Sequence, residues 1–246
     1  MSRLKFLMVA TVAAAAALVA PAKSEAALTV TIKDGANTTI LTDGDNDGLI
    51  TTPTAATNST TGGVVVGGYR IGLTSSFTPG AISSELTTNT TLRVFRTGGA
   101  ISGPLTITVL EDNLTTPVAP ASGLLNLLNA LTLLQVTGTG SNVSVVTIAS
   151  NIPAGAGDPT STSAVTLSNP NSGGDSHTTF KQTTNPYSLS QVFTVTLGSG
   201  GSANFSGTGS VNAAPAPAGL VMLATVLPFA GMLRRRLRKS EVATVA

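Results

Sequence analysis

The sequence predicts an all-β protein whose body is a single β-sandwich or jelly-roll-like domain. Charged residues make up only 10% of the chain, although surface helices need such residues on the face that meets water. Thr, Ser, Gly, Val and Ala take their place. Short apolar and threonine-containing runs are separated by Gly-, Pro- and Asn-rich turns. Such an alternation of short strands and turns is typical of two packed antiparallel sheets.

The first predicted strand covers residues 28–32, where apolar and polar residues alternate, and Asp34-Gly35 follows as a turn. Further strands are predicted at residues 63–73, 92–95, 105–110, 131–136, 143–148, 164–167, 188–197 and 203–211. Leucines spaced three and four apart predict one short helix near residues 122–130. Residues 51–62 and 151–163 are predicted to be long surface loops.

The charges are divided unevenly between the ends and the body. The chain carries a net charge of +2, but residues 28–212 hold only five basic residues against nine acidic ones, a net charge of −4. The body therefore lacks the basic patch that a nucleic-acid partner requires. The chain has no cysteine, which excludes disulfides and thiol chemistry.

Residues 1–27 have the features of a secretory signal peptide. Arg3 and Lys5 precede an uncharged apolar stretch at residues 6–20, and Ser24 and Ala26 fit the small-x-small rule for cleavage. The sequence thus predicts an exported protein with an N-terminal signal helix. An uncleaved membrane anchor is the alternative.

The C-terminal region has the order expected of a membrane-anchored tail. An Ala/Pro linker at residues 213–218 is followed by a sorting or anchor segment at 219–239, and residues 240–246 form a short tail. Within 219–239 an uncharged apolar stretch precedes a basic cluster, and such a cluster holds its end in the cytoplasm. The pattern predicts a C-terminal transmembrane helix with the body outside the cytoplasmic membrane.

Pro215-Ala216-Pro217, the apolar stretch and then Arg234, Arg235 and Arg236 together resemble the sorting signal of PEP-CTERM proteins. Ala216 stands where that family usually has glutamate. The resemblance implies an exosortase-like processing enzyme as a partner. It also implies that Pro215, Pro217 and the three arginines act in sorting. A permanent single-span anchor is the alternative.

The best candidate binding site is Asp43-Gly44-Asp45-Asn46-Asp47-Gly48. Alternating carboxylates on a tight loop direct oxygen ligands toward one centre, as in Ca²⁺-binding loops of the D-x-D-x-D-G type. Asp34 is a possible further ligand if the first strand folds back alongside. The twelfth position is Thr54 rather than the usual glutamate. A polar turn without a metal is the alternative.

Residues that could act as catalytic groups are scarce. His177, the one histidine, lies in a stretch that resembles a loop, and Glu111 and Asp112 would face opposite sides of a strand. A glycosidase needs two carboxyl groups facing one another. The sequence therefore predicts a non-enzymatic, exported cell-envelope or extracellular-matrix protein with no catalytic residues. The alternatives are a Ca²⁺-dependent carbohydrate- or polymer-binding module, with extracellular polysaccharide as its partner, and a secreted hydrolase.

Overall fold

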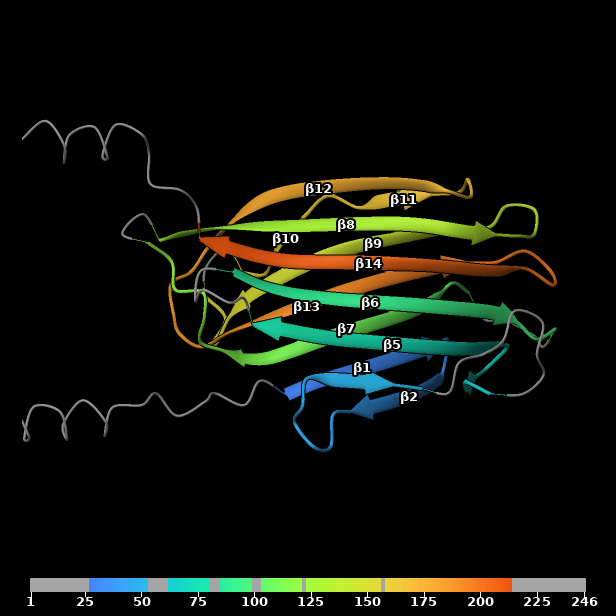
Figure 1. Cartoon of the computed structure of the whole chain (residues 1–246), viewed down its shortest axis with the longest axis horizontal. Coiled ribbons are helices and arrows are strands. Elements are labelled where there is room, and N and C mark those ends of the chain that lie inside the picture. Colours follow the sequence, from blue (N-terminus) through green and yellow to red (C-terminus); the bar gives the residue numbers. More distant parts are fainter. Residues whose placement is uncertain are drawn as a thin grey trace, which may run out of the picture.

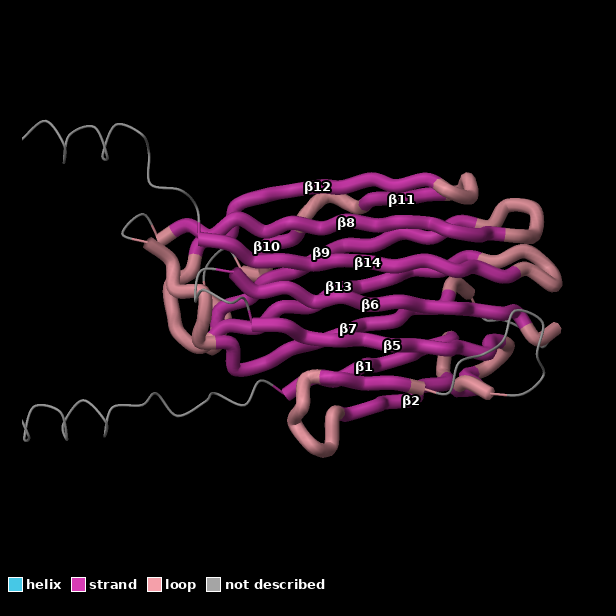
Figure 2. The backbone as a smooth tube through the Cα atoms, viewed as in Figure 1, coloured by secondary structure: helices cyan, strands magenta, loops and turns pink. Residues whose placement is uncertain are grey.

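The computed structural model describes residues 27–52, 62–79, 85–98, 103–120, 123–155 and 158–213. These residues form two seven-stranded antiparallel sheets that pack face to face (Figures 1 and 2). Inside the described ranges, no helix is long and apolar enough to cross a membrane. The predicted signal segment up to residue 26, and the tail with Pro215, Pro217 and Arg234–Arg236, lie outside the described residues.

Each sheet is built from long central strands with short strands at its edges. The first sheet has the order β10 (Thr160–Ser161), β9 (Asn142–Asn151), β13 (Tyr187–Thr196), β7 (Leu105–Leu114), β1 (Ala27–Asp34) and β2 (Asn37–Thr42), with β11 (Val165–Leu167) also paired to β9. The second has the order β12 (Ser172–Lys181), β8 (Leu124–Val136), β14 (Ser202–Ala213), β6 (Glu85–Arg96), β5 (Tyr69–Pro79) and β3 (Leu49–Thr51), with β4 (Val64–Val66) also paired to β5.

The chain changes sheets from β2 to β3, at each connection from β6 to β9, and at each connection from β11 to β14. As a result β6, β14, β8 and β12 lie side by side and face the run β7, β13 and β9 (Figure 1). This arrangement is that of a double-sheet jelly roll. The prediction of an all-β protein with two packed sheets is confirmed.

The long strands alternate between residues that face the core and residues that face water. In β7, β9 and β13 nearly every second residue is buried, as the two-residue period of a strand requires. The buried residues form two apolar clusters. One contains the ring pair Phe193–Phe205 and the other contains Phe180–Tyr187, with centroids 5.7 and 5.8 Å apart.

A layer of buried polar side chains separates the two clusters. On each central strand the inward position between the clusters is polar or glycine, and the polar members are Thr88, Thr90, Glu111, Asn129, Thr147 and Gln191. Thr88 Oγ1 donates to Glu111 Oε1 at 3.0 Å, and Thr147 Oγ1 donates to Asn129 Oδ1 at 3.0 Å. We call these six residues the polar layer.

Two sequence predictions about secondary structure are wrong. The helix predicted near residues 122–130 belongs instead to strand β8, whose inward side carries Leu125, Leu127, Asn129 and Leu131. Leucines line both faces of this strand, so their spacing matches a helical period and a strand period equally well. His177 does not lie in a loop but in β12, where it is exposed.

Candidate functional site

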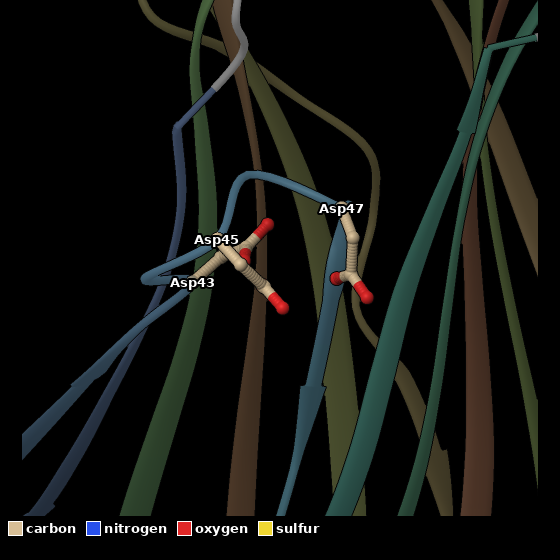
Figure 3. A group of neighbouring side chains, drawn as sticks. All are labelled: Asp43, Asp45 and Asp47. Carbon is tan, nitrogen blue, oxygen red and sulfur yellow. The ribbon is translucent and has the colours of Figure 1, made fainter.

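The aspartate loop, residues 43–48, connects β2 to β3 (Figure 3). Asn46 and Gly48 have φ angles of 56° and 78°, a left-handed conformation that Asn and Gly tolerate better than other residues. The loop is flanked by strands rather than by the helices of an EF-hand. The loop carries the chain from the first sheet to the second, and these two left-handed residues turn the backbone around its own carboxylates.

The three carboxylates converge. Asp43, Asp45 and Asp47 each offer one oxygen, and these oxygens lie within 4.8 Å of one another (Figure 3). Asp43 is 9% exposed, whereas Asp45 and Asp47 are open to solvent. Carboxylate oxygens at this spacing match the hard-oxygen ligand set that Ca²⁺ prefers.

Backbone donors hold the side chains of the loop. Gly48 N donates to Asp43 Oδ2 at 2.7 Å, and Leu49 N donates to Asp47 Oδ1 at 2.8 Å. The other oxygen of Asp43, Oδ1, is buried and accepts no well-aligned hydrogen bond among the described residues. The loop is therefore ordered by its own amides and retains oxygen atoms for another ligand.

The carboxylates influence one another's ionisation. Partial burial opposes the charge on Asp43, but hydrogen bonds from Gly48 N and from Asp45 outweigh it and lower the pKa of Asp43. The hydrogen bond to Asp43 and the charge of Asp47 raise the pKa of Asp45. The three carboxylates therefore repel one another, and a divalent cation between them would relieve the repulsion.

Asp34 does not join this group. It pairs with Asn37 at the turn end of the β1–β2 hairpin, whereas the aspartate loop follows the other end of β2. Asp34 is buried, and its Oδ2 accepts a hydrogen bond from Gly68 N at 2.9 Å. The structure thus corrects the suggestion of a fourth aspartate ligand, because an antiparallel hairpin separates the two ends of β2 by the length of the strand.

A second candidate site is a shallow hollow of about 510 Å³ on the outer face of the second sheet. It lies over β8, β12 and β14 and is lined by Asn126, Leu128, His177, Thr179 and Asn212, among others. No sequence motif could reveal it, because the residues are far apart in the chain. Pairing brings Leu128 opposite His177, and Asn126 opposite both Thr179 and Asn212.

Glu111 lies on β7 with its side chain in the core. It is 1% exposed, and burial raises its pKa to about 8 despite the hydrogen bond from Thr88. Burial and the nearby Glu111 also raise the pKa of Tyr187. Asp112 is half-exposed, so the prediction that the two neighbouring acids face opposite sides is confirmed.

Comparisons with known proteins identify no family. No protein-family model matches, and no curated protein matches. Among solved structures, the chain is similar to TmCBM61 in complex with β-1,4-galactotriose, at 8% identity and a TM-score of 0.30, covering 56% of this chain and 86% of that one.

The family 11 carbohydrate-binding module from Clostridium thermocellum, in complex with a β-1,3-1,4-mixed-linked tetrasaccharide, is also similar, at 8% identity and a TM-score of 0.28, covering 76% of this chain and 96% of that one. A third is the enzymatically active domain of bacteriophage CBA120 tailspike protein 4, at 12% identity and a TM-score of 0.26, covering 56% of this chain and 18% of that one. Sequence identities and TM-scores this low assign neither a family nor an activity to the chain.

Proposed function

We propose that the chain is an exported, non-catalytic β-sandwich module of the cell envelope or extracellular matrix, which binds Ca²⁺ through Asp43, Asp45 and Asp47 and also binds an extracellular polymer. The observation that carries the Ca²⁺ site is the convergence of three carboxylate oxygens within 4.8 Å on one loop. The remaining ligands would be backbone carbonyls and water, since Ca²⁺ takes 6–8 oxygens.

The ligand set suits an extracellular ion concentration. The loop lacks the bidentate glutamate of sensor EF-hands, because its twelfth position is Thr54. Fewer charged ligands weaken binding, and extracellular modules bind Ca²⁺ with dissociation constants on the order of 10⁻⁴–10⁻³ M. Millimolar calcium would therefore occupy the site outside the cell.

Calcium is expected to raise the melting temperature of the full chain by about 5 °C at 10 mM, because an ion that binds only the folded state stabilises it by mass action. The Asp45→Asn, Asp47→Asn double variant should lose this shift. The control is Asp175→Asn, which removes an exposed acid from β12. Equal melting curves in Ca²⁺ and in chelator would rule out the site.

The export and sorting parts of the proposal are supported by the two end segments of the sequence. Replacing Arg234, Arg235 and Arg236 with alanine is expected to change the membrane retention or the processing of the protein, because these residues form the basic cluster behind the apolar stretch. The measurement is cell fractionation with intact mass. Lys33→Ala, at an exposed position of β1, is the control. Unchanged distribution and mass would contradict the sorting role.

The hydrolase alternative gains no support from the placement of the acids. Glu111 is enclosed in the core, its neighbour Asp112 faces outward, and the converging aspartates lie on a loop that connects the two sheets. The hollow on the second sheet, lined by groups without formal charge, favours binding over hydrolysis because hydrolysis of glycosides uses a carboxyl pair.

A further inference from the structure

We propose that the polymer is a neutral polysaccharide and that it binds in the hollow over β8, β12 and β14. This inference rests on the proposed function, because it names the class of polymer and its site. It depends on the outer face of the second sheet and not on the aspartate loop.

The strand pairing builds the hollow from two adjacent rows. In one row His177, Leu128 and Ser210 lie opposite one another on β12, β8 and β14. In the next row Thr179, Asn126 and Asn212 do the same. Residues two apart on a strand share a face, so both rows face outward together. The rows form a continuous strip across three neighbouring strands.

The chemistry of the strip matches sugar hydroxyl groups. Each asparagine carboxamide offers a donor and an acceptor, and the imidazole of His177 offers both in its neutral form. Leu128 is half-exposed between them and provides an apolar surface for the C–H face of a sugar ring. A few placed polar groups around an apolar patch are what ligand sites generally contain.

Asn212 carries a second indication of a ligand. Its Oδ1 is buried and accepts no hydrogen bond from the described residues. A buried acceptor without a donor destabilises the protein by about 1–3 kcal/mol. A ligand hydroxyl that enters beside Asn126 would supply the missing donor if the amide of Asn212 turns toward the hollow.

The charges favour a neutral polymer over an acidic one. The side chains that line the hollow carry no formal charge with histidine neutral. The nearest charges on β12 are Asp175 and Lys181, which flank the strip with opposite signs. The body as a whole has five basic and nine acidic residues, so its field repels polyanions.

The test is affinity electrophoresis of the full chain in mild detergent, through gels that contain mixed-linkage β-glucan, β-1,4-galactan or dextran, with hyaluronate as the anionic probe. At least one neutral polysaccharide should retard the protein and hyaluronate should not. The Asn126→Ala, Asn212→Ala double variant should bind about tenfold or more weakly, since it removes two sets of hydrogen bonds.

Matched controls separate the hollow from the fold. Ser188→Ala and Thr194→Ala change half-exposed residues on the outer face of the first sheet and should leave retardation unchanged. If the double variant unfolds, His177→Ala and Thr179→Ala, both at exposed positions of β12, replace it. Full retardation of folded hollow variants would overturn the site.

A wild-type chain that no neutral polysaccharide retards, while Ca²⁺ still raises its melting temperature, would overturn this inference and leave the calcium site standing. Conversely, loss of the calcium response with retained, hollow-dependent retardation would support the inference and remove the calcium site. Retardation by hyaluronate alone would also overturn it. The two proposals can therefore fail separately.

Discussion

Replacing Gly207 with alanine is expected to lower the free energy of unfolding by about 3 kcal/mol, at the upper end of the range for overpacked cores. A Cβ atom at Gly207 would lie 2.4 Å from Phe193 Cε1 and 2.5 Å from Phe193 Cζ. Side chains do not tolerate such contacts. Phe193 is fully buried and packs against Phe205, so its ring has no free space to move into.

The substitution is destabilising because side chains of the first sheet occupy the space above the glycines of the second. Gly207 and Gly209 are inward positions of β14 in the second sheet, and the side chains of Phe193 and Gln191 cross from the first sheet to fill the space above them. A glycine strand position is normally unfavourable, and close approach of another group is what justifies it. These two glycines are therefore part of the core packing.

Urea unfolding of Gly207→Ala measures the effect. Gly173→Ala is the matched control, because a Cβ at that exposed position on β12 would meet its nearest neighbour at an ordinary 3.6 Å. Its stability should stay within about 0.5 kcal/mol of the wild type. A smaller side chain in Phe193→Leu should partly rescue Gly207→Ala. If Gly207→Ala lowers the free energy of unfolding no more than Gly173→Ala does, the close packing of Phe193 against Gly207 is contradicted.

The stability of the body is expected to fall as pH rises from about 4.5 to about 8, because Glu111 has a folded-state pKa of about 8 and an ordinary value of 4.5. Between these values the unfolded chain releases the proton and the folded chain keeps it. The unfolded state then binds fewer protons, and stability decreases with pH. Below about pH 4.5 both states are protonated and the effect vanishes.

The Glu111→Gln variant should remove this dependence. Glutamine keeps the acceptor for Thr88 and the shape of the side chain, but it has no charge to bury. The variant should be more stable than the wild type at pH 8, by on the order of 4 kcal/mol. It should be nearly equal to the wild type at pH 4. Urea unfolding of both proteins across pH 4 to 9 measures the difference in stability at each pH.

A control variant and the pKa of Tyr187 help to assign the pH dependence to Glu111. Asp112→Asn is the control, because this half-exposed neighbour faces away from the core and should leave the slope in place. The phenol of Tyr187, whose pKa burial and Glu111 raise above its ordinary value, does not ionise in this range. If the free energy of unfolding depends on pH in the same way for Glu111→Gln and the wild type, the glutamate is not the titrating group.

The polar layer accommodates Glu111 in the core in its protonated, uncharged form. Thr88 donates to Glu111, and Thr90 lies within 3.5 Å of Gln191 Oε1 and 3.0 Å of Ser75. Such a network is favourable only while each member is paired, and Glu111 Oε2 and Gln191 Nε2 lack partners among the described residues. The layer thus offers too few donors to hold an ionised Glu111, and the pH dependence of stability follows from that.

The fold class and the aspartate loop could be predicted from the amino-acid sequence alone, because both depend on residues that are close together in the chain. Alternation along residues 28–32 and 188–197 places one face inward whatever the partner strand, and the low charge content excludes extensive surface helices. Asp43, Asp45 and Asp47 are near one another in the chain, so any tight turn brings them together. The remaining ligands and the function of the ends stay predictions.

The strand order, the strand conformation of β8, the polar layer and the hollow depend on contacts between segments that are distant in sequence. Residues 124–136 form a strand because β12 and β14 pair with both of their edges, and that pairing joins segments distant in sequence. The hollow over β8 and the polar layer arise in the same way. Thr90 and Gln191 are 101 positions apart and meet only because the two sheets stack. Local sequence patterns carry no information about such long-range contacts.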